Sequence, residues 1–333
     1  MPDKAVILIN VGTPDSTSVK DVRKYLFQFL NDRRVIDLPL ILQKILVNLI
    51  IVPFRAPKSA KLYQLMWNEN GSPIIYYTKH LAEKIQNLYG NDIKVFYAMR
   101  YGKPSLKELL NKLGNESFSE IIFVPLYPQY ASSTTGSVNQ LIQEQTSKWK
   151  NNTKIRIIEQ FYNHTEFIKA FAQRISEYNI NNFEHLIFSF HGLPLRHIRK
   201  SHPEINIESC TCKTAIPEHG SHCYKATCYQ TAKLLAEELN LPAEKYTVTF
   251  QSRLTKDWLS PFTDSVLADK AKAGYKNILI ASPAFVTDCL ETLVELEIEY
   301  SKLFIENGGK NLSLVKSLND ADYWVNALHK ILQ

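Results

Sequence analysis

The stretch "AVILINVG", residues 5–12, is an apolar run that ends in glycine, and "HLIFSFHG", residues 185–192, repeats the pattern in the second half of the chain. A short continuous apolar run bounded by a turn signal is typical of a strand buried on both faces of a parallel sheet. In each half a second run carries an arginine near its end, and a third run leads into a proline and a polar helix start. These runs are "VFYAMRYG" (95–102) and "IIFVPLYPQYASSTTGS" (121–137), then "TVTFQSRL" (247–254) and "ILIASPAFVTDCLET" (278–292). The shared order predicts two similar domains.

Short apolar runs alternate with helical patterns along the whole chain. The runs are residues 5–12, 94–102, 120–129, 154–161, 185–192, 246–253 and 277–285, and the helical patterns include 105–114, 166–178, 229–240 and 263–274. Strands that alternate with helices form βαβ units and parallel sheets. The sequence therefore predicts an α/β fold of two doubly wound, Rossmann-like domains. We expect each to be a four-stranded parallel sheet flanked by helices, with an active-site cleft between the two domains.

Domain boundaries follow from this repeat. We expect a first domain at residues 1–160, with an apolar segment at the lip of the pocket, 38–73. The second domain spans 161–310 and contains a cysteine-rich insertion at 200–228. The last segment, 311–333, is expected to form a C-terminal helix that packs back on the first domain.

Composition narrows the class of protein. The chain has 333 residues, 45% of them hydrophobic and 22% charged, which is typical of a globular protein. The net charge of +6 is not gathered into any Lys/Arg-rich block, so nucleic-acid binding is not expected. The start of the chain lacks the pattern of a signal peptide, and five cysteines then favour metal binding over disulfides. The expected location is the cytoplasm.

The longest apolar run is "LPLILQKILVNLIIVPF", residues 38–54. It is too short, and too interrupted by polar residues, to be read as a membrane-spanning helix. It suits an amphipathic segment that rests peripherally on the inner membrane or lines the mouth of an apolar pocket, and an ordinary core helix is the alternative.

The stretch "DCLETLVELEIEY", residues 288–300, holds five carboxylates and no cation. In an α-helix, Asp288, Glu291, Glu295 and Glu299 would lie within about 80° of one another. Like charges at this spacing repel, so the stripe weakens its own helix. The stripe is either a solvated face or, at the edge of the sheet where sites are built, a place that holds a cation or takes up protons.

"SFHGLP" places His191 where an apolar strand meets a glycine turn. A single histidine is usually structural, but neighbouring parallel strands bring His191 and the acidic stretch to the same edge. Imidazole and carboxylate together suit Fe²⁺, and equally suit removal of a proton from a ring nitrogen.

Other strand ends add polar and aromatic side chains, each of which could instead be part of a core. Arg100 beside hydroxyl groups suits a ligand carboxylate, and Trp258 and Phe285 offer flat apolar surface. Together with the acidic stretch, these side chains predict a site with an aromatic surface, a cationic group that binds an anion, and carboxylates that pass protons or metal ions. Insertion of a metal into a large, flat, anionic macrocycle needs this chemistry.

Seven motifs, in order along the chain, resemble those of the ferrochelatases. They are "LINVGTPDS" (8–16), "LYQLMWNENGSP" (62–73), "YAMRYGKPS" (97–105), "PLYPQYASSTTGS" (125–137), "SFHGLP" (189–194), "TFQSRL" (249–254) and "FVTDCLETLVELEIEY" (285–300). The resemblance covers nearly the whole chain. It implies two similar four-stranded chelatase-like domains, and a lyase that inserts Fe²⁺ into protoporphyrin IX to give protohaem and two released protons.

The resemblance also implies roles for single residues. His191 and Glu291 would be catalytic and would contact the Fe²⁺ substrate, and Asp288, Glu295 and Glu299 would continue as a path for protons or metal. The residues implied for porphyrin binding are Val11, Ser72, Arg100, Tyr101, Tyr130, Trp258 and Phe285. Cys289 is a departure, because some relatives have histidine there.

The segment "SCTCKTAIPEHGSHCYKATC", residues 209–228, contains a C-x-C-x10-C-x4-C set. Cys210, Cys212, Cys223 and Cys228 suit an iron–sulfur cluster or structural zinc, with His219 and His222 as further zinc ligands. Many ferrochelatases carry a [2Fe–2S] cluster, and this chain resembles bacterial members with an internal cysteine insertion. We therefore expect [2Fe–2S], with zinc or free thiols as alternatives. Cys228 in particular could be a free thiol at the start of its helix.

Three other functions remain open from sequence. A coproporphyrin III ferrochelatase and a cobalt chelatase would share the fold. A non-catalytic haem or iron–sulfur sensor would bind product without turnover and would tolerate loss of Glu291.

Overall fold

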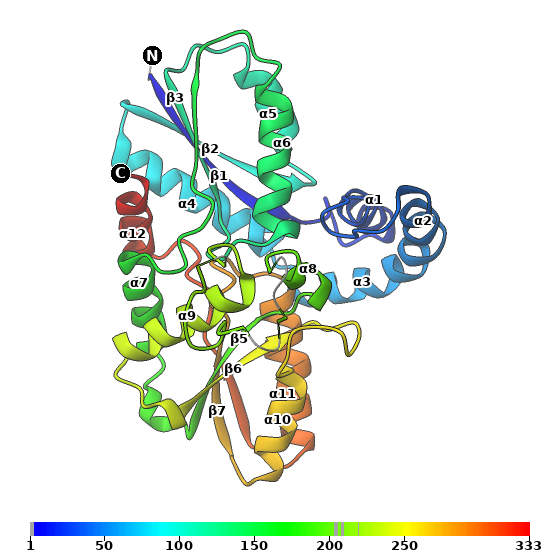
Figure 1. Cartoon of the computed structure of the whole chain (residues 1–333), viewed down its shortest axis with the longest axis vertical. Helices are drawn as coiled ribbons and strands as arrows, with labels where there is room; N and C mark the ends of the chain where they lie inside the picture. The colour runs from blue at the N-terminus through cyan, green and yellow to red at the C-terminus, as the bar shows by residue number, and fades with distance from the viewer. Residues whose placement is uncertain (1–2, 203–205, 208–209, 219) are drawn as a thin grey trace. The chain divides into compact units, whose positions relative to one another are not determined.

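A computed structural model describes residues 3–202, 206–207, 210–218 and 220–333 (Figure 1). The chain forms two compact units. The first contains Met1–Tyr127, Ala131–Gln160 and Leu332, and the second contains Pro128–Tyr130, Phe161–Ile331 and Gln333.

The first unit is built on a parallel sheet with the strand order β2-β1-β3-β4. The strands are β1 (Lys4–Gly12), β2 (Ile93–Tyr101), β3 (Glu120–Pro125) and β4 (Lys154–Ile157). The apolar run that opens the sequence is the central strand β1, which pairs with β2 on one side and β3 on the other. Its residues from Ala5 to Ile9 are fully buried, which explains why the run is continuously apolar.

The second unit repeats this order as β6-β5-β7-β8. Its parallel strands are β5 (His185–His191), β6 (Tyr246–Gln251), β7 (Asn277–Ala281) and β8 (Asn311–Leu314). The predicted fold of two four-stranded parallel sheets flanked by helices is confirmed. The edge strand β8 was absent from the seven predicted runs because its four residues alternate between polar and apolar.

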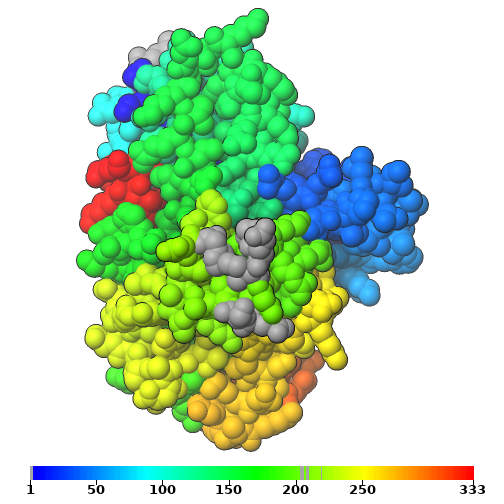
Figure 2. All heavy atoms as spheres, viewed as in Figure 1, coloured from blue at the N-terminus to red at the C-terminus, as the bar shows by residue number. Residues whose placement is uncertain are grey.

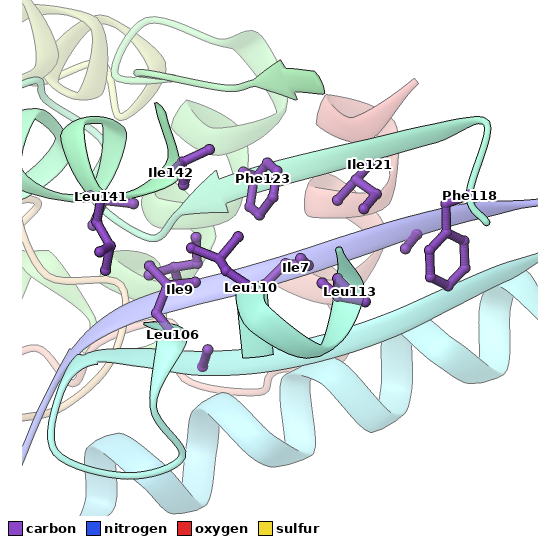
Figure 3. Close-up of a cluster of buried hydrophobic side chains, with 13 residues drawn as sticks. Ile7, Ile9, Leu106, Leu110, Leu113, Phe118, Ile121, Phe123, Leu141 and Ile142 are labelled. Atoms are coloured by element: carbon purple, nitrogen blue, oxygen red, sulfur yellow. The ribbon is translucent and has the colours of Figure 1, made fainter. Parts of the chain in front are cut away.

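Helices cover both faces of the first sheet (Figure 1). One face packs against α5 (Leu106–Leu113) and α6 (Ser137–Thr146). Figure 3 shows leucines of α5 beside Ile7 and Ile9 of β1, and these side chains are inaccessible to solvent. The alternate residues of β1 point to the opposite face, where α4 (Pro73–Tyr89) packs against β1 and β2.

The second sheet has its own core. On one face Ile187, Ile278 and Ile280 pack with Leu296 and Phe304. The helices of this unit include α7 (Thr165–Ser176), α8 (Leu195–Arg199), α9 (Tyr224–Glu238), α10 (Thr263–Lys272), the π-helical η5 (Glu291–Glu299) and α11 (Tyr300–Glu306). Short 3₁₀ turns lie at Ile180–Asn182 and Ala243–Lys245.

The C-terminal helix α12 (Asp322–Leu332) joins the second unit, apart from Leu332. Its Trp324 is inaccessible to solvent and lies 6.0 Å from the ring of Phe161 and 6.1 Å from that of Phe167. The Leu332 carbonyl oxygen accepts a hydrogen bond of 2.8 Å from Arg156 of β4.

One long helical segment of the first unit is apolar and exposed. It runs through α2 (Leu40–Ile45), the π-helical η1 (Leu46–Ile51) and α3 (Val52–Met66), and α3 packs against α1 (Val19–Leu30). The segment of 27 residues is longer than the run seen in the sequence, and by length and composition alone it could cross a membrane, with 22% of its most apolar window buried. Figure 2 shows the blue part of the chain that carries it at the surface.

Candidate functional site

His191 is the last residue of β5 and stands at the carboxyl edge of the second sheet. Gly192 follows, and its N–H donates to the Gln251 carbonyl oxygen at 2.8 Å. A Cβ on Gly192 would lie 2.6 Å from that oxygen, so a larger residue would push the turn away from β6. The Tyr224 hydroxyl donates to the His191 carbonyl oxygen at 2.9 Å and fixes the same turn from α9. Between β5 and β7 the strand order reverses, which is where doubly wound sheets bind ligands.

The imidazole of His191 is half-buried beside aromatic side chains. Its ring stands edge-on to Phe285, with centroids 6.2 Å apart and planes at 89°. The ring of Trp258 lies beside Gly192, and the Trp258 backbone pairs with Pro194. Among the described residues, the buried Nδ1 of His191 has no hydrogen-bond partner. A nitrogen in that position is available to a ligand.

The acidic stretch forms the π-helical segment η5, where we expected an α-helix. π-helical turns are rare and recur at functional sites. The four acids of the predicted stripe are not equivalent. Glu291 and Glu295 are half-buried and interact electrostatically with each other, and Glu295 also with His191. Glu299 is exposed.

Glu295 is held by donors from Ser252, the residue after β6, and from α11. The Ser252 N–H donates to it at 2.7 Å, the Ser252 hydroxyl makes a short hydrogen bond, and the Tyr300 hydroxyl donates at 2.9 Å. Ser252 has φ of 62°, an uncommon conformation for a residue other than glycine, and this aims its N–H at the carboxylate. Burial raises the pKa of Glu295, and the bond from Ser252, the nearby His191 and Tyr300 oppose that rise. The result is an ordered carboxyl group that can hold or release a proton.

Asp288 lies apart from this pair. It is buried and accepts hydrogen bonds from the Ser317 N–H at 3.0 Å and the Asn319 side chain at 2.7 Å. The Thr292 hydroxyl adds a contact of 3.3 Å. These bonds join the residues just before η5 to the loop after β8.

The thiol of Cys289 lies next to the Glu291 carboxylate. Burial raises the pKa of Cys289 well above its usual range, and the negative charge of Glu291 adds to the effect. Cys289 is therefore a neutral, buried neighbour of Glu291.

In the first unit, Arg100 and Tyr101 end β2 and share one buried carboxylate, that of Asp32. Arg100 Nη2 lies 2.7 Å, and the Tyr101 hydroxyl 2.9 Å, from Asp32 Oδ2, and the Ser137 hydroxyl donates to it at 2.6 Å. Arg100 Nε also donates to Ser137 Oγ at 2.8 Å. Burial raises the pKa of Tyr101 far above its usual range, so its hydroxyl stays protonated. Asp32 was missed from sequence, because 68 residues separate it from Arg100.

Ser72 and Val11 lie near the carboxyl end of β1. Ser72 is buried, and its hydroxyl donates to the Thr13 hydroxyl at 3.1 Å, while Val11 is half-buried. Gly12, between Val11 and Thr13, has φ of 102°, and a Cβ there would overlap the Tyr101 carbonyl oxygen at 1.8 Å. Only glycine allows β1 and β2 to end side by side in this way.

Tyr130 belongs to the second unit and stacks on His222, with ring centroids 4.3 Å apart. Val11, Ser72, Arg100 and Tyr101 belong to the first unit, and His191, Trp258, Phe285 and the acidic segment to the second. The cleft between the two domains stays a prediction.

A second cluster lies in the cysteine-rich segment. Sγ of Cys212 is 2.9 Å from Sγ of Cys210 and 3.7 Å from Sγ of Cys223. His202, which the sequence reading missed, places Nε2 3.0 Å from Cys212 Sγ. Ligand atoms of His202, Cys212 and Cys223 all lie within 4.8 Å of one another, and all three residues are buried. His219, considered earlier as a zinc ligand, lies outside the described residues.

Two sulfurs bound to one tetrahedral metal with bonds of about 2.3 Å lie roughly 3.8 Å apart. The distance between Cys212 and Cys223 fits that value. Burial raises the pKa of both thiols, so each keeps its proton unless a metal displaces it. The donor set therefore fits a thiolate-bound metal or cluster.

Two four-stranded parallel sheets, each flanked by helices, give the chain a two-domain α/β fold of the chelatase-like kind. A solved multi-domain protein of Deinococcus radiodurans, described as structurally similar to chelatases, matches 98% of this chain with a TM-score of 0.50 and 9% identity. The chain spans 53% of that protein.

The sequence comparisons identify the family. The family model "Ferrochelatase" matches residues 3–333. The chain is 41% identical to the ferrochelatase of Legionella pneumophila strain Corby over 330 residues, 99% of this chain and 98% of the relative. It is also 41% identical to that of Coxiella burnetii strain Dugway, covering 98% of this chain and 92% of the relative. The chain belongs to the ferrochelatase family, as its motifs predicted.

Proposed function

We propose that the protein inserts Fe²⁺ into protoporphyrin IX, giving protohaem and two released protons, as the last step of haem biosynthesis. Membership of the ferrochelatase family supports the reaction class. The observation that carries the site assignment is the buried Nδ1 of His191, which has no hydrogen-bond partner in the described part of the chain, near the carboxylates of Glu291 and Glu295. A reaction that exchanges two N–H protons for one divalent cation needs such a mixture of base and ligand.

The chemistry divides between these side chains. Neutral imidazole at His191 can accept a pyrrole proton or bind the incoming cation through a free nitrogen. Glu291 is its acidic partner for protons or Fe²⁺. Glu295, fixed by Ser252 and Tyr300, passes protons or metal onward, and Glu299 offers a carboxylate at the exposed end of the same segment. The hydrogen bonds of Asp288 favour a structural role over a place in this path.

The remaining residues are proposed to hold the macrocycle. Trp258 and Phe285, beside His191, offer apolar faces for a flat ring. Arg100 is already paired with Asp32, so little of its charge is left to bind the propionates of the porphyrin. In our proposal this ion pair instead keeps the end of β2 rigid. Val11, Ser72, Tyr101 and Tyr130 complete the porphyrin contacts that the family resemblance implies.

The first test is anaerobic turnover, followed as loss of protoporphyrin fluorescence when Fe²⁺ enters. Wild type is expected to turn over. His191→Ala and Glu291→Ala should lose at least about two orders of magnitude in kcat, the contribution of a positioned acid–base group, and still bind porphyrin. Glu297→Gln, an exposed carboxylate of the same segment, is the matched control and should retain activity.

The same assay with coproporphyrin III and with Co²⁺ tests the substrate assignment. Protoporphyrin is favoured because the exposed apolar segment 38–54 suits a poorly soluble substrate. Faster insertion into coproporphyrin would correct the substrate, and a preference for Co²⁺ would correct the metal. A stable haem complex without turnover would replace the enzyme with a sensor.

We also propose that the cysteine-rich segment holds a [2Fe–2S] cluster, with structural zinc as the alternative metal. Cys210, Cys212, Cys223 and Cys228 would supply the four thiolates. A cluster there would cross-link the segment to α9 and add a one-electron redox centre. Anaerobically purified wild type should absorb visible light with equal iron and sulfide, and Cys210→Ser should lose that absorbance. A colourless wild type that contains zinc would select the alternative.

Peripheral membrane contact is proposed for residues 38–54. Ile41, Leu49 and Phe54 are 73%, 68% and 72% exposed, which is unusual for side chains of this kind. Cosedimentation with lipid vesicles should fall when Ile41 and Phe54 are both changed to serine. Leu88→Ser, an exposed leucine on α4, is the control and should bind as wild type does. Equal binding of vesicles by wild type and both variants would contradict the proposed membrane contact.

A further inference from the structure

His202 is a buried histidine whose tautomer is set by its neighbours. It is 3% exposed, and its Nδ1 lies 2.9 Å from the Ile198 carbonyl oxygen. Nδ1 also lies 3.3 Å from the Ser201 hydroxyl, which itself donates to the Ile198 carbonyl oxygen at 2.8 Å. Because a carbonyl oxygen only accepts, these contacts favour the tautomer with the proton on Nδ1, in which the neutral ring has its lone pair on Nε2. Metal-binding histidines usually donate their other N–H in this way.

The lone pair of His202 points at the thiols. Nε2 lies 3.0 Å from Cys212 Sγ, and Cys212 lies 3.7 Å from Cys223. For tetrahedral coordination with typical bond lengths, the nitrogen–sulfur distance would be roughly 3.5 Å. Small side-chain shifts therefore suffice to close the group around one metal ion. Cys210, 2.9 Å from Cys212, brings a fourth donor from the adjoining loop.

Cys228 has different surroundings. It lies inside α9, five residues after the N-cap Cys223, and a helical residue at that distance is turned by about 140°. Its buried thiol interacts with the side chain of Tyr224, whose hydroxyl donates to the His191 carbonyl oxygen. Among the described residues, the group of mutually close ligand atoms consists of His202, Cys212 and Cys223 and contains neither Cys210 nor Cys228. Cys210 is joined to this group by its contact of 2.9 Å with Cys212 Sγ.

We propose that the metal centre is held by His202, Cys210, Cys212 and Cys223, and that Cys228 is a buried thiol outside the ligand set. The inference rests on the proposed metal centre and replaces one of its four cysteines by histidine. Three thiolates and one imidazole suit a [2Fe–2S] cluster with a single histidine ligand, and equally suit structural zinc.

The test identifies the metal ligands by spectroscopy and does not depend on chelatase activity. The full chain is purified anaerobically, reconstituted with iron and sulfide, and assayed for iron, sulfide and zinc. Pulsed electron paramagnetic resonance of the reduced cluster should show coupling to a ¹⁴N nucleus. If zinc is bound, X-ray absorption should show one nitrogen at about 2.0–2.1 Å and three sulfurs at about 2.3 Å.

Four variants separate the two ligand sets. His202→Cys should keep the metal and lose the nitrogen signal, and Cys228→Ser should keep both. His202→Ala and Cys212→Ser should lose metal to a chelator at least tenfold faster than wild type.

The outcomes are distinct. Metal bound by four sulfurs in wild type, or its loss in Cys228→Ser with retention in His202→Ala, would overturn the histidine assignment alone. Wild type that binds neither cluster nor zinc after reconstitution would overturn the centre as well. Chelatase activity is measured separately, so its absence bears on the proposed function and not on the ligands.

Discussion

At the scale of single residues, Glu295 shows how the fold tunes one carboxyl group. Burial favours its protonated form, and three donors from Ser252 and Tyr300 favour the charged form. Burial outweighs these donors, so the pKa of Glu295 is raised, which suits a carrier of protons. The size of that rise depends on single hydroxyl groups and can be changed by removing them.

Ser252→Gly and Tyr300→Phe each remove one hydroxyl donor from Glu295. A hydrogen bond to a charged group is worth about 1.5–3 kcal/mol, so losing one raises the pKa of Glu295 by about one unit or more. The acid limb of kcat/KM should then move to higher pH by about that amount in both variants. Glycine at 252 also tolerates the positive φ, so the backbone N–H donor should remain in place.

The control for these variants is Tyr246→Phe, a change on β6 outside the hydrogen bonds of Glu295. Its pH profile should match that of wild type. An acid limb that stays unmoved in both Ser252→Gly and Tyr300→Phe would show that ionisation of Glu295 does not limit the reaction.

Sequence patterns found some of these residues and not others. His191 and the acidic stretch 288–300 were predicted as site residues because they lie at or after the ends of apolar strands, and Glu291 was named through the family resemblance. Asp32, Ser252 and His202 carry no local signal. Asp32 acts on a partner 68 residues away, Ser252 acts through a backbone angle, and His202 matters only because folding brings it to Cys212.

At the scale of elements, β5 carries a titratable group at each end, and His185 at its start is the simpler one. It is 5% exposed, with Nε2 2.8 Å from the Thr247 hydroxyl. Burial, with help from Lys270 and Lys245, lowers the pKa of His185 to about 4. The folded protein therefore keeps this imidazole neutral at pH values where the unfolded chain protonates it.

The stability of the second unit should consequently fall as pH drops from 6.5 towards 4. In that range the unfolded state binds the extra proton, so protonation favours unfolding, by at most about 3 kcal/mol once pH reaches 4. His185→Gln should flatten this part of the stability curve relative to wild type. The measurement is the free energy of unfolding in urea, determined for both proteins between pH 4 and 8 and compared at each pH. Parallel curves would show that the pKa of His185 is the same in the folded and unfolded states.

The other end of β5 is tied to α9 by Tyr224. Tyr224→Phe removes the bond to the His191 carbonyl oxygen, which is worth about 1 kcal/mol. The Tm should fall by about 2–4 °C, as measured by calorimetry. Cys228→Ser is the control, because it keeps a polar partner for Tyr224 and leaves that bond intact. An unchanged Tm in Tyr224→Phe would mean that water replaces the hydroxyl.

In the acidic segment, the spacing of charged and apolar residues did not predict the type of helix. Thirteen residues with acids at intervals of three and four predict an α-helix, and the chain forms a π-helix over Glu291–Glu299. A π-helix makes fewer degrees of turn per residue, so Glu291 and Glu295 stay on one face. Its stability comes from packing of Val294 and Leu296, which are buried, and from the bonds to Glu295. Of these groups, Ser252 lies far from the segment in sequence, so local periodicity cannot show its contribution.

At the scale of the whole molecule, the repeated strand order was readable from sequence. Each half places a continuous apolar strand at the centre of its sheet, and such runs are the strongest local signal of a buried strand. The edge strand β8 and the extended helix Leu40–Met66 were less visible, because both are partly exposed and their patterns are mixed.

Because the second unit has its own hydrophobic core, we expect it to fold without the first. The second unit has its own sheet, its own buried cluster and all the residues of the proposed metal centre. We expect a fragment of residues 161–333 to fold cooperatively and bind the metal, with a lower Tm than the full chain. It lacks Gln129, whose side chain donates to the Thr231 hydroxyl at 3.0 Å. It should be inactive as a chelatase, because the first-unit residues proposed for porphyrin binding are missing.

Circular dichroism during heating and metal analysis of the purified fragment measure both expectations. The control is the same fragment with Leu279→Asp, which places a charge in the fully buried centre of β7 and should prevent folding. A wild-type fragment that remains unfolded with or without metal would show that the second core depends on the first unit. A folded fragment without metal would instead place a ligand outside residues 161–333, against the centre proposed from His202 and the three cysteines.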